Sequence, residues 1–172
     1  MFSPGRKTAF EKAVNANFND LYRFAYWLCR NRWQAEDIVQ ESLMRAWRGW
    51  AGLREERAVR AWLFTIVQRE FRRAGARAAR PEPLAHAEEL AFHPDPGAPL
   101  ELERALRELP EESCEALLMQ VLGGFSCSEI AAALGSSEGA IMTRLARARQ
   151  ALRRRLDPAG ATEGRQAWAA ST

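Results

Sequence analysis

The chain has few of the residues that build active sites, metal centres or disulfide frameworks. Its only histidines, His86 and His93, lie in one proline-rich stretch, and no nucleophile–base pair or glycine-rich phosphate loop is recognisable. Its three cysteines, Cys29, Cys114 and Cys127, are widely spaced and form no C-x-x-C pair. That usage favours a reducing compartment, with each cysteine acting as a small buried hydrophobe. We therefore expect a protein that is not an enzyme and that holds neither a metal nor a cofactor.

Long apolar runs and strand-like patterns are also missing. No hydrophobic stretch approaches the roughly 20 residues that span a bilayer. The N-terminus has basic residues but no apolar segment behind them, so it does not resemble a secretory signal. No segment alternates apolar and polar residues as a half-buried strand does. We expect an all-α protein of the cytoplasm, long enough at 172 residues for one domain or two small ones.

Lysine is scarce, and the charges are segregated along the chain. Of the 25 basic residues only Lys7 and Lys12 are lysines. Residues 1–80 carry 16 basic and 8 acidic side chains, residues 81–138 carry 2 and 12, and residues 139–172 carry 7 and 2. Arginine suits phosphates and guanine edges, which favours a nucleic-acid partner. A high genomic GC content would produce the same arginine bias, so the segregation is the stronger indication.

Helical periodicity in residues 1–80 predicts a first domain of three helices. Apolar spacing places one helix over about 8–30, a second that starts after Asn31 and stops near the glycines at 49–52, and a third over about 57–77. Between the last two helices lies a short polar loop with a charged tip.

A linker and a tail are predicted from composition. Residues 81–99 hold five of the eight prolines and no basic side chain, which is typical of a flexible acidic linker. This segment is either a solvated tether or a mimic of a nucleic-acid backbone that lies in a positively charged channel. The Gly/Ala-rich tail, residues 157–172, is expected to be disordered.

Residues 100–156 are predicted as a second domain of four helices. A short helix stops at Pro110, another runs from Glu111 to the glycine pair at 123–124, and two more occupy 125–155. At about 55 residues the unit is small but within the range that folds alone.

Residues 125–155 have the layout of a helix-turn-helix, whose second helix enters the major groove of DNA. Gly135 supplies a turn at which positive φ is cheap, and Ser136 or Ser137 can cap the next helix. That helix holds six arginines and no acidic residue after Gly139. Its apolar stripe, which leaves the arginines largely on other faces, consists of Ile141, Leu145, Ala148 and Leu152. Taken alone, an arginine-rich amphipathic helix is also compatible with an ordinary solvated face.

Two stretches resemble the extracytoplasmic-function (ECF) family of RNA polymerase sigma factors. Similarity to the family's region 2 lies in LYRFAYWLCRNRWQAEDIVQESLMRAWRGW and RAWLFTIVQREFRRAGAR. Similarity to region 4 lies in LRELPEESCEALLMQVLGGFSCSEIAAALGSSEGAIMTRLARARQALRRRL. With the linker, the match covers roughly residues 18–156 in the family's order. The resemblance implies a subunit that binds the β′ clamp and β flap of core RNA polymerase, recognises promoter −10 and −35 elements, and helps to open DNA.

The resemblance implies that the last helix binds the −35 element. The matching positions are Ser137, Thr143, Arg144, Arg147, Arg149 and Arg153. Arg149 and Arg153 are expected closer to the DNA backbone than to the bases. At Met142 many family members carry Lys or Arg, which puts the particular −35 sequence in doubt but not the binding mode.

Region 2 of the family captures the melted −10 strand, and the resemblance places this role in the loop at 53–57 and in the helix after it. Exposed bases are held by stacking, by pockets and by basic contacts to phosphate. The basic candidates are Arg54, Arg57, Arg60, Arg69, Arg72, Arg73 and Arg77. Trp62 matches a family aromatic, but its place in an apolar stripe favours core packing, and Trp47 and Trp50 call for the same caution.

The family's clamp-binding helix matches Asp37, Gln40, Glu41 and Arg45. Asp37 and Glu41 are four residues apart and so share one helix face, which suits a basic partner surface. From the residues alone, an ordinary solvated face with a Glu41–Arg45 ion pair is the alternative.

Two other functions fit parts of the sequence. A sigma-like adaptor would sequester an anti-sigma factor without binding DNA, but such a protein has no use for the two basic blocks present here. A stand-alone helix-turn-helix regulator would leave the first 80 residues without a role. The resemblance also implies an anti-sigma partner, which can hold such a protein at the inner membrane. The partner's identity, the inducing signal and the promoter sequence are not readable from this chain.

Overall fold

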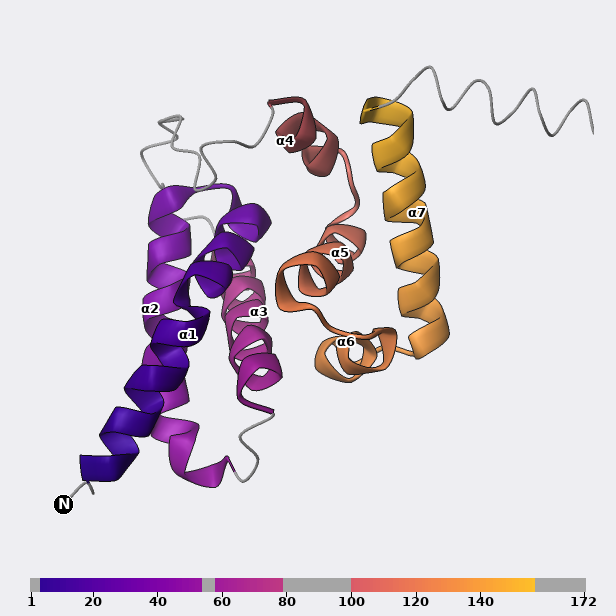
Figure 1. The fold of residues 1–172 in the computed structure, drawn as a ribbon. Coiled ribbons are helices and arrows are strands. Elements are labelled where there is room, and N and C mark those ends of the chain that lie inside the picture. The colour runs from indigo at the N-terminus through magenta and orange to yellow at the C-terminus, as the bar shows by residue number, and fades with distance from the viewer. Residues whose placement is uncertain (1–3, 54–57, 79–99, 157–172) are drawn as a thin grey trace, which may run out of the picture.

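The computed structural model describes residues 4–53, 58–78 and 100–156 of the chain. Within them the chain forms seven α-helices and one 3-10 turn, in two groups that lie side by side (Figure 1). The all-α prediction is confirmed for this part of the chain. The predicted linker and tail lie outside the described residues.

In the described part, no helix combines the length and the apolar character that a membrane span needs.

The N-terminal group consists of α1 (Pro4–Cys29), α2 (Arg32–Gly49) and α3 (Val59–Ala78). The first boundary has a clear local cause, because the Asn31 side chain accepts a hydrogen bond from the backbone N–H of Gln34 at 3.1 Å and so caps α2. A 3-10 turn, η1 (Trp50–Gly52), ends α2 as the glycines predicted.

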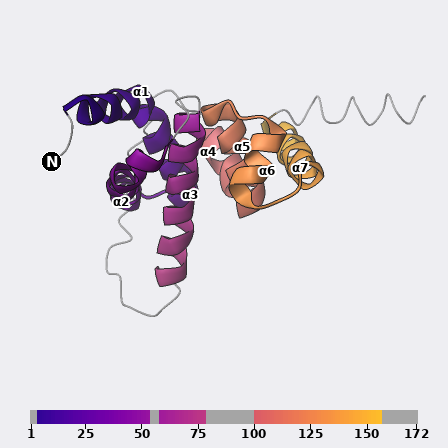
Figure 2. The same ribbon diagram turned by 90° about the horizontal axis from the view of Figure 1, so that it is seen from below.

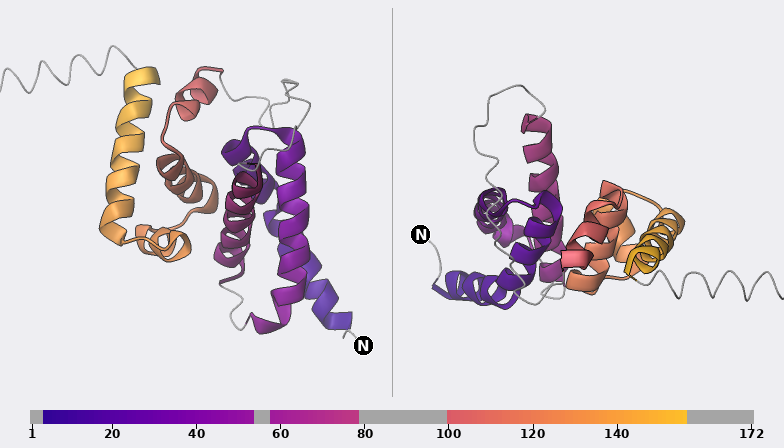
Figure 3. Two further views of the ribbon diagram at one scale, coloured as in Figure 1. Left: turned by 180° about the vertical axis from the view of Figure 1, so that it is seen from behind. Right: turned by 90° about the horizontal axis from the view of Figure 1, so that it is seen from above.

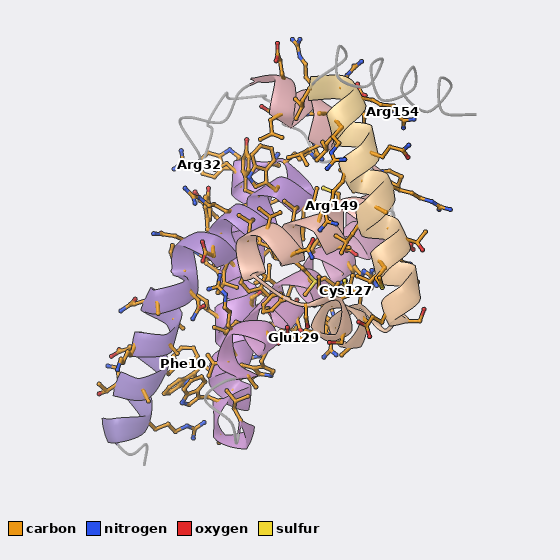
Figure 4. All side chains as sticks on the ribbon, turned by 45° about the vertical axis from the view of Figure 1, so that its right-hand side comes forward. Phe10, Arg32, Cys127, Glu129, Arg149 and Arg154 are labelled. Atoms are coloured by element: carbon orange, nitrogen blue, oxygen red, sulfur yellow. The ribbon has the colours of Figure 1, made fainter. Side chains whose placement is uncertain are left out.

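Aromatic side chains fill the interior of the N-terminal group. Phe24 of α1 and Phe64 of α3 are fully buried, with ring centroids 5.0 Å apart. A second aromatic cluster lies at the far end of the group, where Phe10 meets Trp47 and Trp50 edge-on at 5.1 and 5.2 Å. Figure 4 shows Phe10 on α1 at this end. Both tryptophans are half-buried, and Trp50 packs against the core, as its apolar spacing predicted.

The C-terminal group consists of α4 (Leu100–Arg107), α5 (Glu111–Gly123), α6 (Cys127–Leu134) and α7 (Glu138–Leu156). Gly124 ends α5 at φ 73° and Gly135 ends α6 at φ 62°, so both predicted turns use the left-handed conformation that glycine favours. Ser126 and Glu129 form a capping box at the start of α6.

The two groups share one continuous apolar core, which the sequence patterns did not predict. α5 packs against α1 and α3, and α6 packs against α3. Figures 2 and 3 show the groups adjacent from three further directions. Phe125, in the turn between α5 and α6, packs edge-on against Phe64 with centroids 5.1 Å apart. Tyr26 and Trp27 of α1 are also buried.

The position of Phe125 depends on a glycine. A Cβ added at Gly123 would lie 2.2 Å from the Phe125 ring, closer than a real contact allows. We therefore expect Gly123→Ala to lower the free energy of unfolding by about 1–3 kcal/mol, the usual cost of overpacking. Urea denaturation followed by circular dichroism measures this change.

The control is Gly75→Ala in α3, where an added Cβ meets nothing within 4 Å. Alanine is the better helix former, so this variant should gain about 0.5–1 kcal/mol. Equal denaturation midpoints for the two variants would contradict the packing of Phe125 on Gly123.

Candidate nucleic-acid interface

The helix-turn-helix predicted for 125–155 is formed by α6 and α7. The turn closes with a hydrogen bond from the Ser136 N–H to the Ala131 carbonyl at 2.9 Å. Ser137 caps α7, because its hydroxyl accepts from the Ala140 N–H at 3.2 Å. Glu138 lies in the first turn of α7 and three arginines in the last, so both charges complement the helix dipole.

One face of α7 is buried and the opposite face is open to a ligand. The predicted apolar stripe is confirmed, since Ile141, Leu145 and Ala148 are buried and Leu152 packs, partly buried, against the core. Thr143 and Arg147 lie on the opposite face and are exposed, and the Thr143 hydroxyl donates to the Gly139 carbonyl at 2.9 Å. This face carries the side chains that a DNA groove would meet first.

Two of the arginines predicted to bind the −35 element contact α5 and so connect α7 to it. Arg144 is 24% exposed and forms an ion pair with Glu112 at 2.6 Å. Arg149 donates to the Gln120 side chain at 2.5 Å. These contacts place both arginines at the edges of the exposed face. Arg153 is exposed near the end of α7.

The sequence analysis missed two residues of the same face. Gln150 and Arg154 follow Thr143 by 7 and 11 residues, a spacing that returns to one side of a helix, and both are exposed. Figure 4 shows Arg154 at the C-terminal end of α7. Extending the 4-7-11 spacing from Thr143 would have identified both. Met142, the departure from the family pattern, is exposed at the flank of this face.

The arginines predicted for the −10 strand have different surroundings. Arg54 and Arg57 lie outside the described residues, and Arg77 belongs to the last turn of α3. Arg69 is exposed, and Arg73 is an exposed side chain that forms an ion pair with Glu70 at 3.1 Å.

Beside these arginines lies an open crevice of about 450 Å³ between α3 and α6. Its lining residues are Gln68, Arg69, Arg72, Arg73, Ala133, Leu134 and Gly135. Three guanidinium groups in one crevice favour the binding of a polyanion.

Arg60 and Arg72 contact the C-terminal group. Arg60 donates to the Leu122 and Gly123 carbonyls at 2.6 and 2.9 Å and forms an ion pair with Asp20 at 2.8 Å. Arg72 forms an ion pair with Glu115 at 2.7 Å. In this arrangement both arginines join the two groups of helices.

The face predicted to bind polymerase lies along α2 and is exposed. Asp37 and Gln40 are open to solvent, while Glu41 and Arg45 form the i,i+4 ion pair expected from their spacing, at 2.9 Å. Arg45 Nε also lies 2.8 Å from a Glu70 carboxylate oxygen, which connects α2 to α3.

Two large apolar side chains on the same face of α2 were missed. Trp33 is 61% exposed and Met44 is 49% exposed. They lie four residues before and seven residues after Asp37, so helical spacing puts them beside the acidic positions. Exposed aromatic and methionine side chains next to charges are typical of protein-binding surfaces.

The cysteines have the surroundings of packing residues. Burial raises the pKa of Cys29 to about 11 and also raises the pKa of Cys114, so both thiols stay protonated at neutral pH. In the described part of the chain, no three His, Cys, Asp or Glu side chains come together in a way that could hold a metal ion.

Two family models match the chain in this order. Sigma-70 region 2 matches residues 13–80, which include α2 and α3, and Sigma-70 region 4 matches residues 100–152, which include the helix-turn-helix. One match falls in each group of helices.

Relatives and solved structures agree with these matches. The chain is 32% identical to the ECF sigma factor SigM of Mycobacterium tuberculosis over 88% of this chain and 79% of the relative. It is 36% identical to EcfG of Rhodopseudomonas palustris over 77% and 76%.

Among solved structures, the sigma factor RpoE in complex with the anti-sigma factor NepR from Bartonella quintana matches with a TM-score of 0.73 and 31% identity, over 86% of this chain and 96% of that one. CnrH in complex with the cytosolic domain of CnrY matches with a TM-score of 0.65 and 26% identity, over 89% and 90%. The chain belongs to the ECF family of RNA polymerase sigma factors.

Proposed function

We propose that this sigma factor directs core RNA polymerase to promoters whose −35 element is bound by α7 and whose melted −10 strand is bound by α3 and the loop before it. The −10-binding surface belongs to a domain at residues 1–80 and the −35-binding surface to a domain at residues 100–156, and residues 81–99 join the two domains. The observation that carries the proposal is the exposed face of α7, which is basic and polar and has no acidic residue after the first turn.

At the −35 element, the residues divide by their position on α7. Thr143, Arg147 and Gln150 lie centrally on the exposed face and contact base edges in the major groove. Arg153 and Arg154, at the last turn, contact phosphates. Ser137 caps the N-terminal turn of α7, and the backbone N–H groups of that turn contact a phosphate of the DNA backbone.

At the −10 element, arginines of α3 hold the backbone of the melted strand. Arg69, Arg72 and Arg73 line the crevice beside α3, and the family resemblance adds Arg77 and the loop residues Arg54 and Arg57. Phosphate contacts confer affinity and salt dependence but no sequence preference. Trp50 of η1 and Trp62 of α3, which flank this loop in the sequence, have ring centroids 6.2 Å apart.

Core polymerase binds the exposed face of α2. Asp37, Gln40 and Glu41 offer acceptors to a basic surface, and Trp33 and Met44 offer the apolar contacts that dominate binding energy at interfaces. The chain thus contributes binding energy in the cytoplasm, whereas nucleotide chemistry belongs to the polymerase.

An anti-sigma factor is the second partner we propose. One of the solved structures that the chain resembles, the sigma factor RpoE, is a complex with the anti-sigma factor NepR. The exposed basic face of α7 argues against an adaptor that only sequesters an inhibitor, because such an adaptor has no use for a DNA-binding surface. Run-off transcription from genomic fragments with core polymerase distinguishes the two functions, since only a sigma factor yields promoter-specific transcripts.

Arg147 provides a test of −35 binding. If Arg147 makes a bidentate contact to a base, Arg147→Ala should weaken binding to the cognate −35 element by about 1–3 kcal/mol and relax the preference at one base pair. Transcription by the reconstituted holoenzyme from promoters with single −35 substitutions measures this effect.

The matched control is Arg155→Ala, which removes the same charge from α7 at a side chain paired with Glu108. This variant should keep the base preference. An Arg147→Ala variant that weakens all sequences equally would show that Arg147 contacts phosphate only.

Asp37 provides a test of polymerase binding. Asp37→Asn keeps the size of an exposed side chain and removes its charge, so we expect about tenfold weaker binding to core polymerase, or about 1.4 kcal/mol. Fluorescence anisotropy of the labelled sigma factor titrated with core enzyme gives the affinity.

Its control is Glu36→Gln, one residue away and paired with Arg32 at 2.9 Å on another side of α2. Equal affinities for the two variants would rule out the proposed face.

A further inference from the structure

The contact between the two groups of helices depends on three arginines of the N-terminal group. Arg30 donates to the Leu106 carbonyl at 2.6 Å, at the end of α4. Arg60 donates to the two carbonyls at the end of α5. Of the three, Arg72 is the one that forms an ion pair across the contact, with the carboxylate of Glu115.

The Glu115 carboxylate lies where the two groups of helices meet, and its partners come from the other group. Its side chain is fully buried in α5, although α5 lies in the other group from its partners. Arg72 donates to its two carboxylate oxygens at 2.7 and 3.3 Å, and the Gln68 amide lies 3.4 Å away. A buried carboxylate without partners is costly, so these two residues of α3 are what make its burial tolerable.

The Arg72–Glu115 geometry is the one that an arginine uses for phosphate. Two nitrogens of the guanidinium group face two oxygens of an anion, and the same fork matches carboxylate and phosphate. Arg72 also lines the open crevice between α3 and α6 with Arg69 and Arg73. Its side chain is 46% exposed there, so an incoming polyanion reaches it without prior unfolding.

We propose that Glu115 is a built-in competitor of the DNA backbone for Arg72. In the packed arrangement the Glu115 carboxylate occupies the position on Arg72 that a phosphate would occupy. When a DNA phosphate binds Arg72 instead, the buried Glu115 carboxylate loses its main partner. Binding of the −10 strand and packing of the two groups therefore oppose each other. This inference rests on the proposed role of α3 in −10 binding.

The test uses the full chain with Glu115→Gln, which keeps the side-chain shape and removes its charge. The probe is a short fluorescein-labelled single-stranded DNA, followed by anisotropy, and small-angle X-ray scattering measures the radius of gyration. If the packed arrangement holds about nine molecules in ten, its loss should tighten DNA binding roughly tenfold. The radius of gyration of the free variant should rise, and saturating DNA should raise that of the wild-type chain.

The matched control is Glu108→Gln, which removes one negative charge from the same group at a residue paired with Arg155 inside that group. It should leave the radius of gyration unchanged and alter DNA affinity only by the general effect of one charge. A charge exchange, Arg72→Glu with Glu115→Arg, should restore the compact form while lowering DNA affinity.

Three results would overturn the proposal. Glu115→Gln would bind DNA no tighter than Glu108→Gln, or would bind tighter without expansion, or would expand without a gain in affinity. If any of these occurs while the wild-type chain directs promoter-specific transcription, the competition is wrong and the proposed function stands. If transcription is not promoter-specific, the proposed function fails whatever Glu115→Gln does.

Discussion

The arrangement of the two groups depends on arginines that satisfy backbone carbonyls across the contact between them. Helix C-termini leave carbonyls without intrahelical partners, and in this protein Arg30 fills that need for α4 and Arg60 for α5. Phe64 and Phe125 add one edge-on aromatic contact. Beside the shared apolar core, the contact therefore includes polar groups that water or phosphate can also satisfy, which suits two DNA-binding units that must change their separation.

The same dependence explains why an arginine-rich sequence overstates the number of DNA contacts. Arg60 and Arg72 contact the C-terminal group, while Arg144 and Arg149 connect α7 to α5. Each of these side chains has a protein acceptor at hydrogen-bonding distance. An arginine of this chain can thus serve contacts within the protein or contacts with DNA, and only the partner of its guanidinium group distinguishes the two roles.

Local features of the fold could be predicted from the sequence, because their causes are local. Asn31, Gly124 and Gly135 mark helix ends through capping and positive φ, and the apolar stripe of α7 fixes which side faces outward. The exposed face of α7 could be predicted in part: Thr143 and Arg147 occupy positions of the family motif, whereas Gln150 and Arg154 follow only from the helical spacing. The partners of Arg60 and Glu115 could not be predicted, since they lie 40 or more residues away on helices whose mutual position no periodicity encodes.

The chemistry of Glu115 agrees with a contact that opens. A buried ion pair adds little net stability compared with apolar side chains of the same volume. The neighbours of Glu115 on α5, among them Ala116 and Leu117, are buried and apolar, so the position also has surroundings that suit an apolar residue. An apolar residue there would hold α5 on α3 whatever the ligand. A carboxylate holds it only while no competing anion takes the arginine, and so makes the packing of the two groups depend on the DNA that this family binds.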